Sequence, residues 1–217
     1  MISRRAFVAG TSMAFVVPTV AMASARKPKL PPGRDPGGVA VALIGPGTDY
    51  TDPMIAARLA RDGEGDLIGW DFIDNDNRPF AVGESWVADP RSLVDLAPSA
   101  RFIPIRVPRS HPAVRQRALL FALQTPARIV LFAERFLQSG EIESVRAMAQ
   151  AAQPVLVIAA GDAPAASPAG NLLLLPDPAA CLRAMQLAVR VIDTERVDTG
   201  EALKQRLLVS PELLRKP

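Results

Sequence analysis

At 217 residues the chain is long enough for one well-packed domain and too short for two comfortable ones. Its content of 49% apolar and 22% charged residues is typical of a globular protein and excludes a disordered chain. Basic residues outnumber acidic ones by only 25 to 22, and the excess falls to one without Arg4 and Arg5, so the charge gives no indication of nucleic-acid binding.

Residues 1–25 predict a twin-arginine export signal. Arg4 and Arg5 precede an apolar stretch, and the sequence AMA at 21–23 offers small residues to signal peptidase. We expect cleavage after Ala23 or Ala25, a periplasmic or secreted bacterial protein, and membrane contact only during export. The alternative is a short membrane anchor, but at about 18 residues the interrupted apolar run is marginal for a stable span.

The rest of the chain predicts a linker, one α/β domain and a tail. Residues 26–38 form a linker rich in proline, glycine and basic residues, with neither helical nor strand periodicity. In residues 39–193, short and mostly apolar runs alternate with amphipathic stretches, and such runs are typical of strands buried on both faces of a parallel sheet. Residues 194–217 predict a polar, helical tail with few core anchors.

The alternation of runs predicts a doubly wound α/β fold with a mostly parallel sheet of about six strands flanked by helices. The strands are expected at Val39–Ile44, Leu67–Phe72, Phe102–Val107, Ile129–Phe132, Val155–Ala160 and Leu172–Leu175. The helices are expected at Asp52–Leu59, Ala113–Gln124, Glu141–Ala152 and Asp177–Asp193.

The segment 39–80, VAVALIGPGTDYTDPMIAARLARDGEGDLIGWDFIDNDNRPF, resembles the opening of a subtilisin-like serine protease, a member of the subtilase family. In that family an apolar strand delivers a catalytic Asp in the pattern V-A-V-I-D-T-G, and Gly45 stands at the Asp position here. Residues 97–107, 118–132 and 155–162 are similar to later strands and helices of the family, in the same order. The resemblance covers roughly residues 39–175 and implies an incomplete subtilisin-like sheet.

The resemblance also implies that the catalytic positions are replaced. A subtilase needs an Asp that orients a His, a His that takes the Ser proton, and an Asn that donates to the oxyanion. Gly83, in the sequence GESWVA, stands where the His motif H-G-T-H-V-A is expected. Asp162 stands at the Asn position, where a carboxylate repels the charge that must be stabilised. We therefore expect a catalytically inactive protein, a pseudopeptidase.

The family's serine motif, G-T-S-M-A, occurs only at residues 10–14, inside the export signal and before the expected Asp strand. We interpret it as a coincidence of small and apolar residues. The alternative is an active serine endopeptidase with an unusual residue set, or one completed by a partner chain. Its first candidates are Ser85, Ser110 and the single histidine, His111, which matches no subtilase position and is more typical of a solvated loop. The single Cys181 excludes an intramolecular disulfide and is expected to be a buried thiol.

Two further patterns in the sequence resemble parts of ligand sites. The turn Gly45-Pro46-Gly47 lacks the third glycine and the acidic partner of a dinucleotide site, so no nucleotide is expected. Asp71, Asp74 and Asp76 are weak candidates for a Ca²⁺ site, because their spacing differs from that of a helix-loop-helix calcium loop. No other cofactor is expected.

A retained cleft without catalytic groups predicts a protein- or peptide-binding module. Its expected lining is acidic and favours a basic peptide or protein as the partner: Asp49, Asp52, Glu84, Glu134 and Asp162. Glu134 and Arg135 follow the strand that binds substrate in subtilases, where the family has small residues, so they crowd the edge to which a peptide adds as a strand.

Overall fold

A computed structural model describes residues 27–82, 93–95, 97–109, 111–132, 137–161 and 170–214. The predicted export signal, with the sequence GTSMA at 10–14, lies outside these residues. Among the helices that are described, none is long and apolar enough to cross a membrane.

The described strands form one six-stranded sheet in the order β2-β3-β1-β4-β5-β6, and every neighbouring pair is parallel. Their bounds are β1 Val39–Gly45, β2 Trp70–Asp71, β3 Ala100–Arg106, β4 Ile129–Phe132, β5 Leu156–Ala160 and β6 Leu172–Leu175. The sheet therefore confirms the predicted α/β fold with a parallel sheet. All seven residues of β1 and all five of β5 are buried, which explains their uninterrupted apolar sequence.

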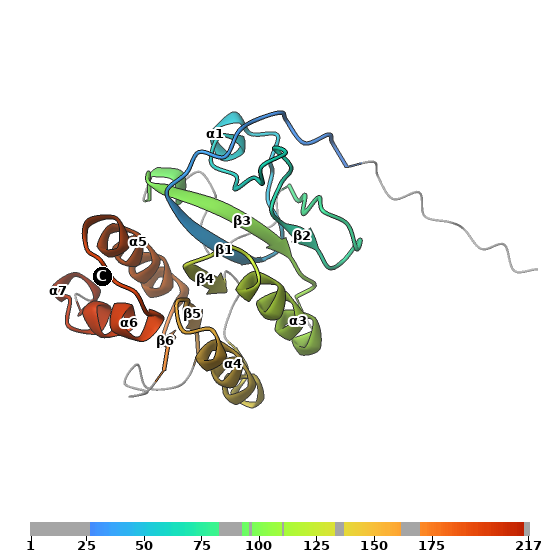
Figure 1. Cartoon of the computed structure of the whole chain (residues 1–217). Helices are drawn as coiled ribbons and strands as arrows, with labels where there is room; N and C mark the ends of the chain where they lie inside the picture. Colours follow the sequence, from blue (N-terminus) through green and yellow to red (C-terminus); the bar gives the residue numbers. More distant parts are fainter. Residues whose placement is uncertain are drawn as a thin grey trace, which may run out of the picture.

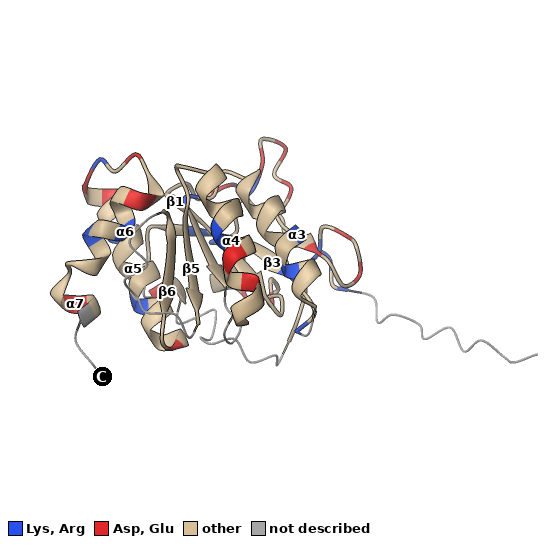
Figure 2. Cartoon of the chain, turned by 90° about the horizontal axis from the view of Figure 1, so that it is seen from below, with Lys and Arg blue, Asp and Glu red and all other residues tan. Residues whose placement is uncertain are grey.

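Helices cover both faces of the sheet (Figures 1 and 2). On one face α3 (Pro112–Leu123) and α4 (Ser139–Ala151) pack on side chains such as Ile103, Val130 and Val157. On the other face α5 (Pro178–Thr194) and α6 (Gly200–Leu208) pack on side chains such as Leu131 and Ile158. Two further short helices are α1 (Pro53–Ala56) and α7 (Pro211–Leu214).

The predicted helix from Asp52 to Leu59 is wrong in its second half. Asp52 caps the start as expected, accepting a hydrogen bond from the Met54 amide at 2.9 Å, but α1 ends at Ala56. Leu59 then forms a parallel bridge with Phe102, and the Ala60 amide donates to the Phe102 carbonyl at 2.8 Å. Pairing with the sheet therefore replaces the last helical turn.

Strand β2 is much shorter than the predicted Leu67–Phe72. Leu67 instead forms an antiparallel bridge with Arg61, inside a local turn. Gly69 passes close to β3, since a Cβ on it would lie 2.6 Å from the Pro104 carbonyl oxygen. Only Trp70 and Asp71 pair with β3, at Ile105 and Arg106.

The C-terminal tail is better anchored than its polar sequence suggests. Leu203 and Leu207 of α6 are each 1% exposed and belong to the core on the α5 side of the sheet. Lys204, between them, is fully buried, and its ammonium donates to the Gly170 carbonyl at 3.2 Å. The tail, expected to be helical and to pack at the edge of the sheet or fray, thus forms a helix that packs on the sheet through a small number of core residues.

Candidate functional site

The carboxyl ends of β1, β2 and β3 meet at one edge of the sheet, the place where ligands bind in open α/β folds. Gly45 ends β1 there, is buried, and pairs in register with Arg106 at the end of β3. Its carbonyl accepts a hydrogen bond from the Val107 amide at 2.8 Å. The Arg106 Nε donates to the next carbonyl, that of Pro46, at 3.1 Å. The polar side chain that meets the end of β1 is therefore a guanidinium.

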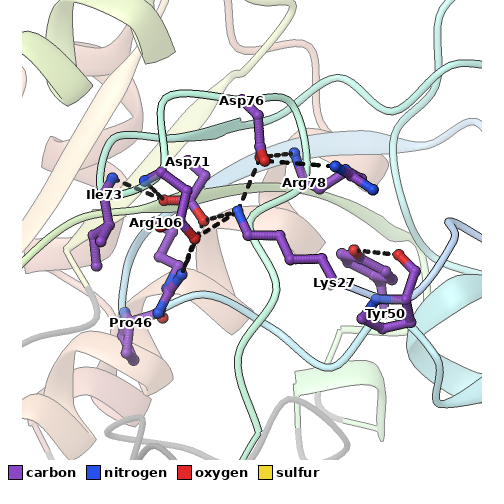
Figure 3. A network of polar contacts seen from close by, with 10 residues as sticks. Lys27, Pro46, Tyr50, Asp71, Ile73, Asp76, Arg78 and Arg106 are labelled. Atoms are coloured by element: carbon purple, nitrogen blue, oxygen red, sulfur yellow. Dashed lines mark hydrogen bonds and ion pairs between the residues drawn. The ribbon is translucent and has the colours of Figure 1, made fainter. Parts of the chain in front are cut away.

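The Arg106 guanidinium belongs to a cluster of charged side chains (Figure 3). We call it the Lys27–Arg106 cluster, and its members are Lys27, Asp71, Asp74, Asp76 and Arg106. The Lys27 ammonium lies 2.6 Å from Asp71, 2.9 Å from Asp74 and 3.0 Å from Asp76. Arg106 Nη1 lies 3.0 Å from Asp71 and 3.1 Å from Asp74. Asp71, whose side chain has no exposed surface, therefore receives two cations.

Backbone amides fix the Asp71 carboxylate as well. Its Oδ1 accepts from the amides of Ile73 at 2.8 Å and Asp74 at 3.0 Å, so the chain turns around the carboxylate directly after β2. The turn closes through two backbone hydrogen bonds between Asp71 and Asp76. Asn75 takes the left-handed conformation at its tip, with φ 55°, which asparagine tolerates well.

The charges in the cluster shift one another's pKa values. Burial alone raises the pKa of Asp71, but hydrogen bonds from Lys27, from backbone amides and from Arg106 outweigh it and leave the pKa below 3.8. Burial alone lowers the pKa of Lys27, but the carboxylates of Asp71, Asp74 and Asp76 raise it above 10.5. Both groups therefore stay charged over the neutral range.

The predicted Ca²⁺ candidates are brought together, but the Lys27 ammonium sits among them (Figure 3). Within the described parts of the chain, no three His, Cys, Asp or Glu side chains are grouped so that they could hold a metal ion. Asp71, Asp74 and Asp76 instead attach the segment before β1 to the end of β2. That segment, predicted as a linker, makes further contacts: Tyr50 donates to the Pro28 carbonyl at 2.9 Å, and Arg61 to the Pro31 carbonyl at 2.8 Å.

The two described candidates for an acidic cleft have local roles. Asp49 accepts hydrogen bonds from the amide and the hydroxyl of Thr51, at 3.0 and 2.5 Å. Asp52 caps α1 through the Met54 amide. Gly83, Glu84, Glu134 and Asp162 lie outside the described residues, and so do Ser85 and Ser110. His111 is exposed and occupies the position before α3, where its side chain caps no backbone amide.

Sequence reasoning missed a second ion pair, between Arg115 of α3 and Glu141 of α4. Arg115 Nε and Nη2 donate to Glu141 Oε1 at 3.0 and 2.8 Å, and Nη2 also donates to Oε2 at 2.9 Å. Both side chains are nearly buried. Glu141 also accepts from the Gln138 amide at 3.1 Å, which closes a capping box at the start of α4. The spacing of Gln138 and Glu141 is a signal for that box, whereas nothing local indicates Arg115.

Two solved structures are similar to the chain. One is a cold-adapted subtilisin-like serine proteinase, with a TM-score of 0.43 and 16% identity over 60% of this chain and 48% of that one. The other is fervidolysin from Fervidobacterium pennivorans, a keratinolytic enzyme related to subtilisin, with a TM-score of 0.38 and 17% identity over 61% of this chain and 22% of that one. The chain thus spans about half or less of either protein. No family model and no curated protein matches it, and the α/β class follows from its own sheet order and parallel pairing.

Proposed function

We propose that this protein is an exported, catalytically inactive subtilase-like domain that acts by binding a basic peptide or protein. The observation that supports inactivity is Gly45. A serine protease of this kind needs a carboxylate that holds a histidine in the correct orientation. Gly45 brings no side chain to the end of β1, and the side chain that meets this end is Arg106, already paired with Asp71 and Asp74. A guanidinium repels the imidazolium that a catalytic carboxylate stabilises.

The preference for a basic partner rests on the ends of β4 and β5. These strands are adjacent and parallel, so their carboxyl ends share one edge of the sheet. In the sequence Glu134 and Asp162 each follow the end of a strand by two positions. The Leu137 amide donates to the Ala160 carbonyl at 2.8 Å, so Leu137 lies beside the end of β5. Two carboxylates at such an edge attract a cationic ligand.

Binding can be tested with a fluorescently labelled peptide of alternating lysine and glycine, using residues 26–217 and fluorescence anisotropy. We expect the variant Glu84→Lys/Glu134→Lys/Asp162→Lys to lose binding. The control Glu64→Lys/Glu143→Lys/Asp193→Lys makes the same change of charge at exposed positions and should retain it. Equal binding by both variants, or no binding by the native protein, would contradict the proposal that these three carboxylates bind a basic ligand.

Export is tested separately, because it depends on other residues. Replacing Arg4 and Arg5 by lysine keeps the charge of the signal but removes the arginine pair. Cell fractionation should then find the protein inside the cell, and native-like export of this variant would contradict the twin-arginine assignment.

A further inference from the structure

A groove of about 430 Å³ is lined by residues of the edge strand β2, the turn after it and helix α3. Strand β2 and α3 are neighbours in Figure 1. Trp70, Phe72 and Phe121 line the groove, and all three rings are only half-buried. The ring centroid of Phe121 lies 6.3 Å from that of Trp70 and 6.2 Å from that of Phe72. Leu120 extends this apolar wall and is 48% exposed. We call this feature the β2–α3 groove.

A single cation, Arg117, stands at the groove. Its guanidinium carbon lies 5.4 Å from the centroid of the Phe72 ring, within the range of a cation–π contact. The N–H donors of a guanidinium lie in its plane, and a cation–π contact does not use them as hydrogen-bond donors, so a carboxylate can bind them. Among the described residues no carboxylate forms an ion pair with Arg117. Asp74 and Asp76, which flank Asn75 of the groove, are both paired with Lys27.

Two amide side chains complete the lining, Asn75 and Gln124. They come from the two sides of the groove, Asn75 from the turn after β2 and Gln124 from the end of α3. The backbone of the turn that holds Asn75 is fixed by hydrogen bonds to Asp71. A mostly apolar lining with a few polar groups and one charge is typical of small-molecule sites, and the β2–α3 groove has such a lining.

The geometry points to a binding site for a small aromatic carboxylate in the β2–α3 groove. The ring of the ligand packs among Trp70, Phe72 and Phe121, where offset and edge contacts between rings are favourable. The carboxylate accepts in-plane hydrogen bonds from Arg117. The assignment does not rest on the proposed function, because it concerns a different surface and a ligand of opposite charge. A free aromatic acid and the C-terminal aromatic residue of a peptide share this chemistry.

The emission of Trp70 reports binding directly, in a Trp86→Phe background that leaves it as the only tryptophan. The probe is 3-phenylpropionate, with 3-phenylpropanol as the uncharged analogue and propionate as the analogue without a ring. We expect a saturable change with 3-phenylpropionate. Arg117→Gln should weaken its binding about ten-fold and leave 3-phenylpropanol unaffected, as expected for the loss of a charge-assisted hydrogen bond. Arg117→Lys keeps the charge but loses the planar arrangement of donors. Its affinity for 3-phenylpropionate should lie between that of the native protein and that of Arg117→Gln.

Arg196→Gln is the matched control, because Arg196 follows α5 on the other face of the sheet and should not affect binding. The peptide acetyl-Gly-Gly-Phe with a free carboxylate, compared with its amide, separates the two sources of the ligand. Tighter binding of the peptide acid than of 3-phenylpropionate indicates a chain terminus, and the reverse indicates a free acid. The assignment is overturned by an unsaturable response, by equal binding of propionate, or by undiminished binding of 3-phenylpropionate to Arg117→Gln.

Discussion

The Lys27 ammonium lies 2.6 Å from the carboxylate of Asp71, a side chain with no exposed surface. The two residues are 44 positions apart, so the contact joins the segment before β1 to the end of β2. A buried carboxylate is stable only when cations and hydrogen bonds compensate for lost solvation, and here Lys27, Arg106 and two backbone amides do so.

Asp71→Asn should lower the free energy of unfolding by about 3 kcal/mol, because it leaves Lys27 and Arg106 without their buried partner. Urea unfolding followed by circular dichroism measures the change. Glu143→Gln is the control, since the Glu143 side chain is 81% exposed and its removal should cost less than about 0.5 kcal/mol. An Asp71→Asn effect as small as that of the control would show that the cluster does not stabilise the fold.

The contribution of the cluster should depend on pH in a defined window. The pKa of Asp71 is lowered, so its stabilisation is present above its unfolded value of 3.8 and is lost as the pH falls through the lower folded value. The pKa of Lys27 is raised, so its stabilisation is present below 10.5 and is lost as the pH rises through the higher folded value.

The stability difference between the native protein and Asp71→Asn should therefore be constant from about pH 5 to pH 9 and shrink outside that range. Urea unfolding of both proteins at a series of pH values measures it. A difference that keeps rising or falling across the neutral range would contradict the assigned shifts.

The pair Arg115 and Glu141 should show strong coupling. Arg115→Met removes the cation from a nearly buried carboxylate and should cost about 3 kcal/mol. Adding Glu141→Gln removes the charge that was left behind while keeping an acceptor for the Gln138 amide. The double variant should then lose clearly less than the sum of the two single variants, as measured by urea unfolding. Additive losses would show that the pair contributes no more than two independent contacts.

Cys181 should resist thiol reagents in the folded protein. It is 2% exposed on α5, and burial raises its pKa to about 12, so the reactive thiolate is scarce at neutral pH. We expect a chromogenic disulfide reagent to react only after the protein is unfolded in guanidinium. Rapid reaction of the native protein would contradict the packing of α5 on the sheet.

The sequence predicts most of the sheet, because strands buried on both faces have continuously apolar sequences, as in Ile129–Phe132 and Leu172–Leu175. It fails at β2, where only two residues pair with β3, and at α6, where packing of Leu203 and Leu207 is not evident from a polar segment. The starts of the capped helices were predictable. An Asp before a Pro, as in Asp177 and Pro178, indicates a helix start, and the Asp177 side chain does accept a hydrogen bond from the Ala180 amide at 2.7 Å.

The site was less predictable, because its partners are distant in the sequence. The spacing of Asp71, Asp74 and Asp76 indicated a cluster of oxygen atoms but not the cation among them. Lys27 and Arg106 lie 44 and 35 positions from Asp71, and no local pattern joins them. The same holds for Arg115 and Glu141, which are 26 positions apart on different helices. Such contacts follow from the strand order, which periodicity does not specify.

The proposed absence of catalysis is tested most directly by a fluorophosphonate probe applied to residues 26–217, with an active subtilisin as the positive control and the heat-denatured protein as the negative one. On the proposal that Gly45 stands in place of a catalytic carboxylate, we predict that the probe labels the control and leaves every serine of this chain unmodified. Labelling of one serine in the native protein, lost on heating and lost in Ser85→Ala or Ser110→Ala, would contradict the proposal and identify an active enzyme.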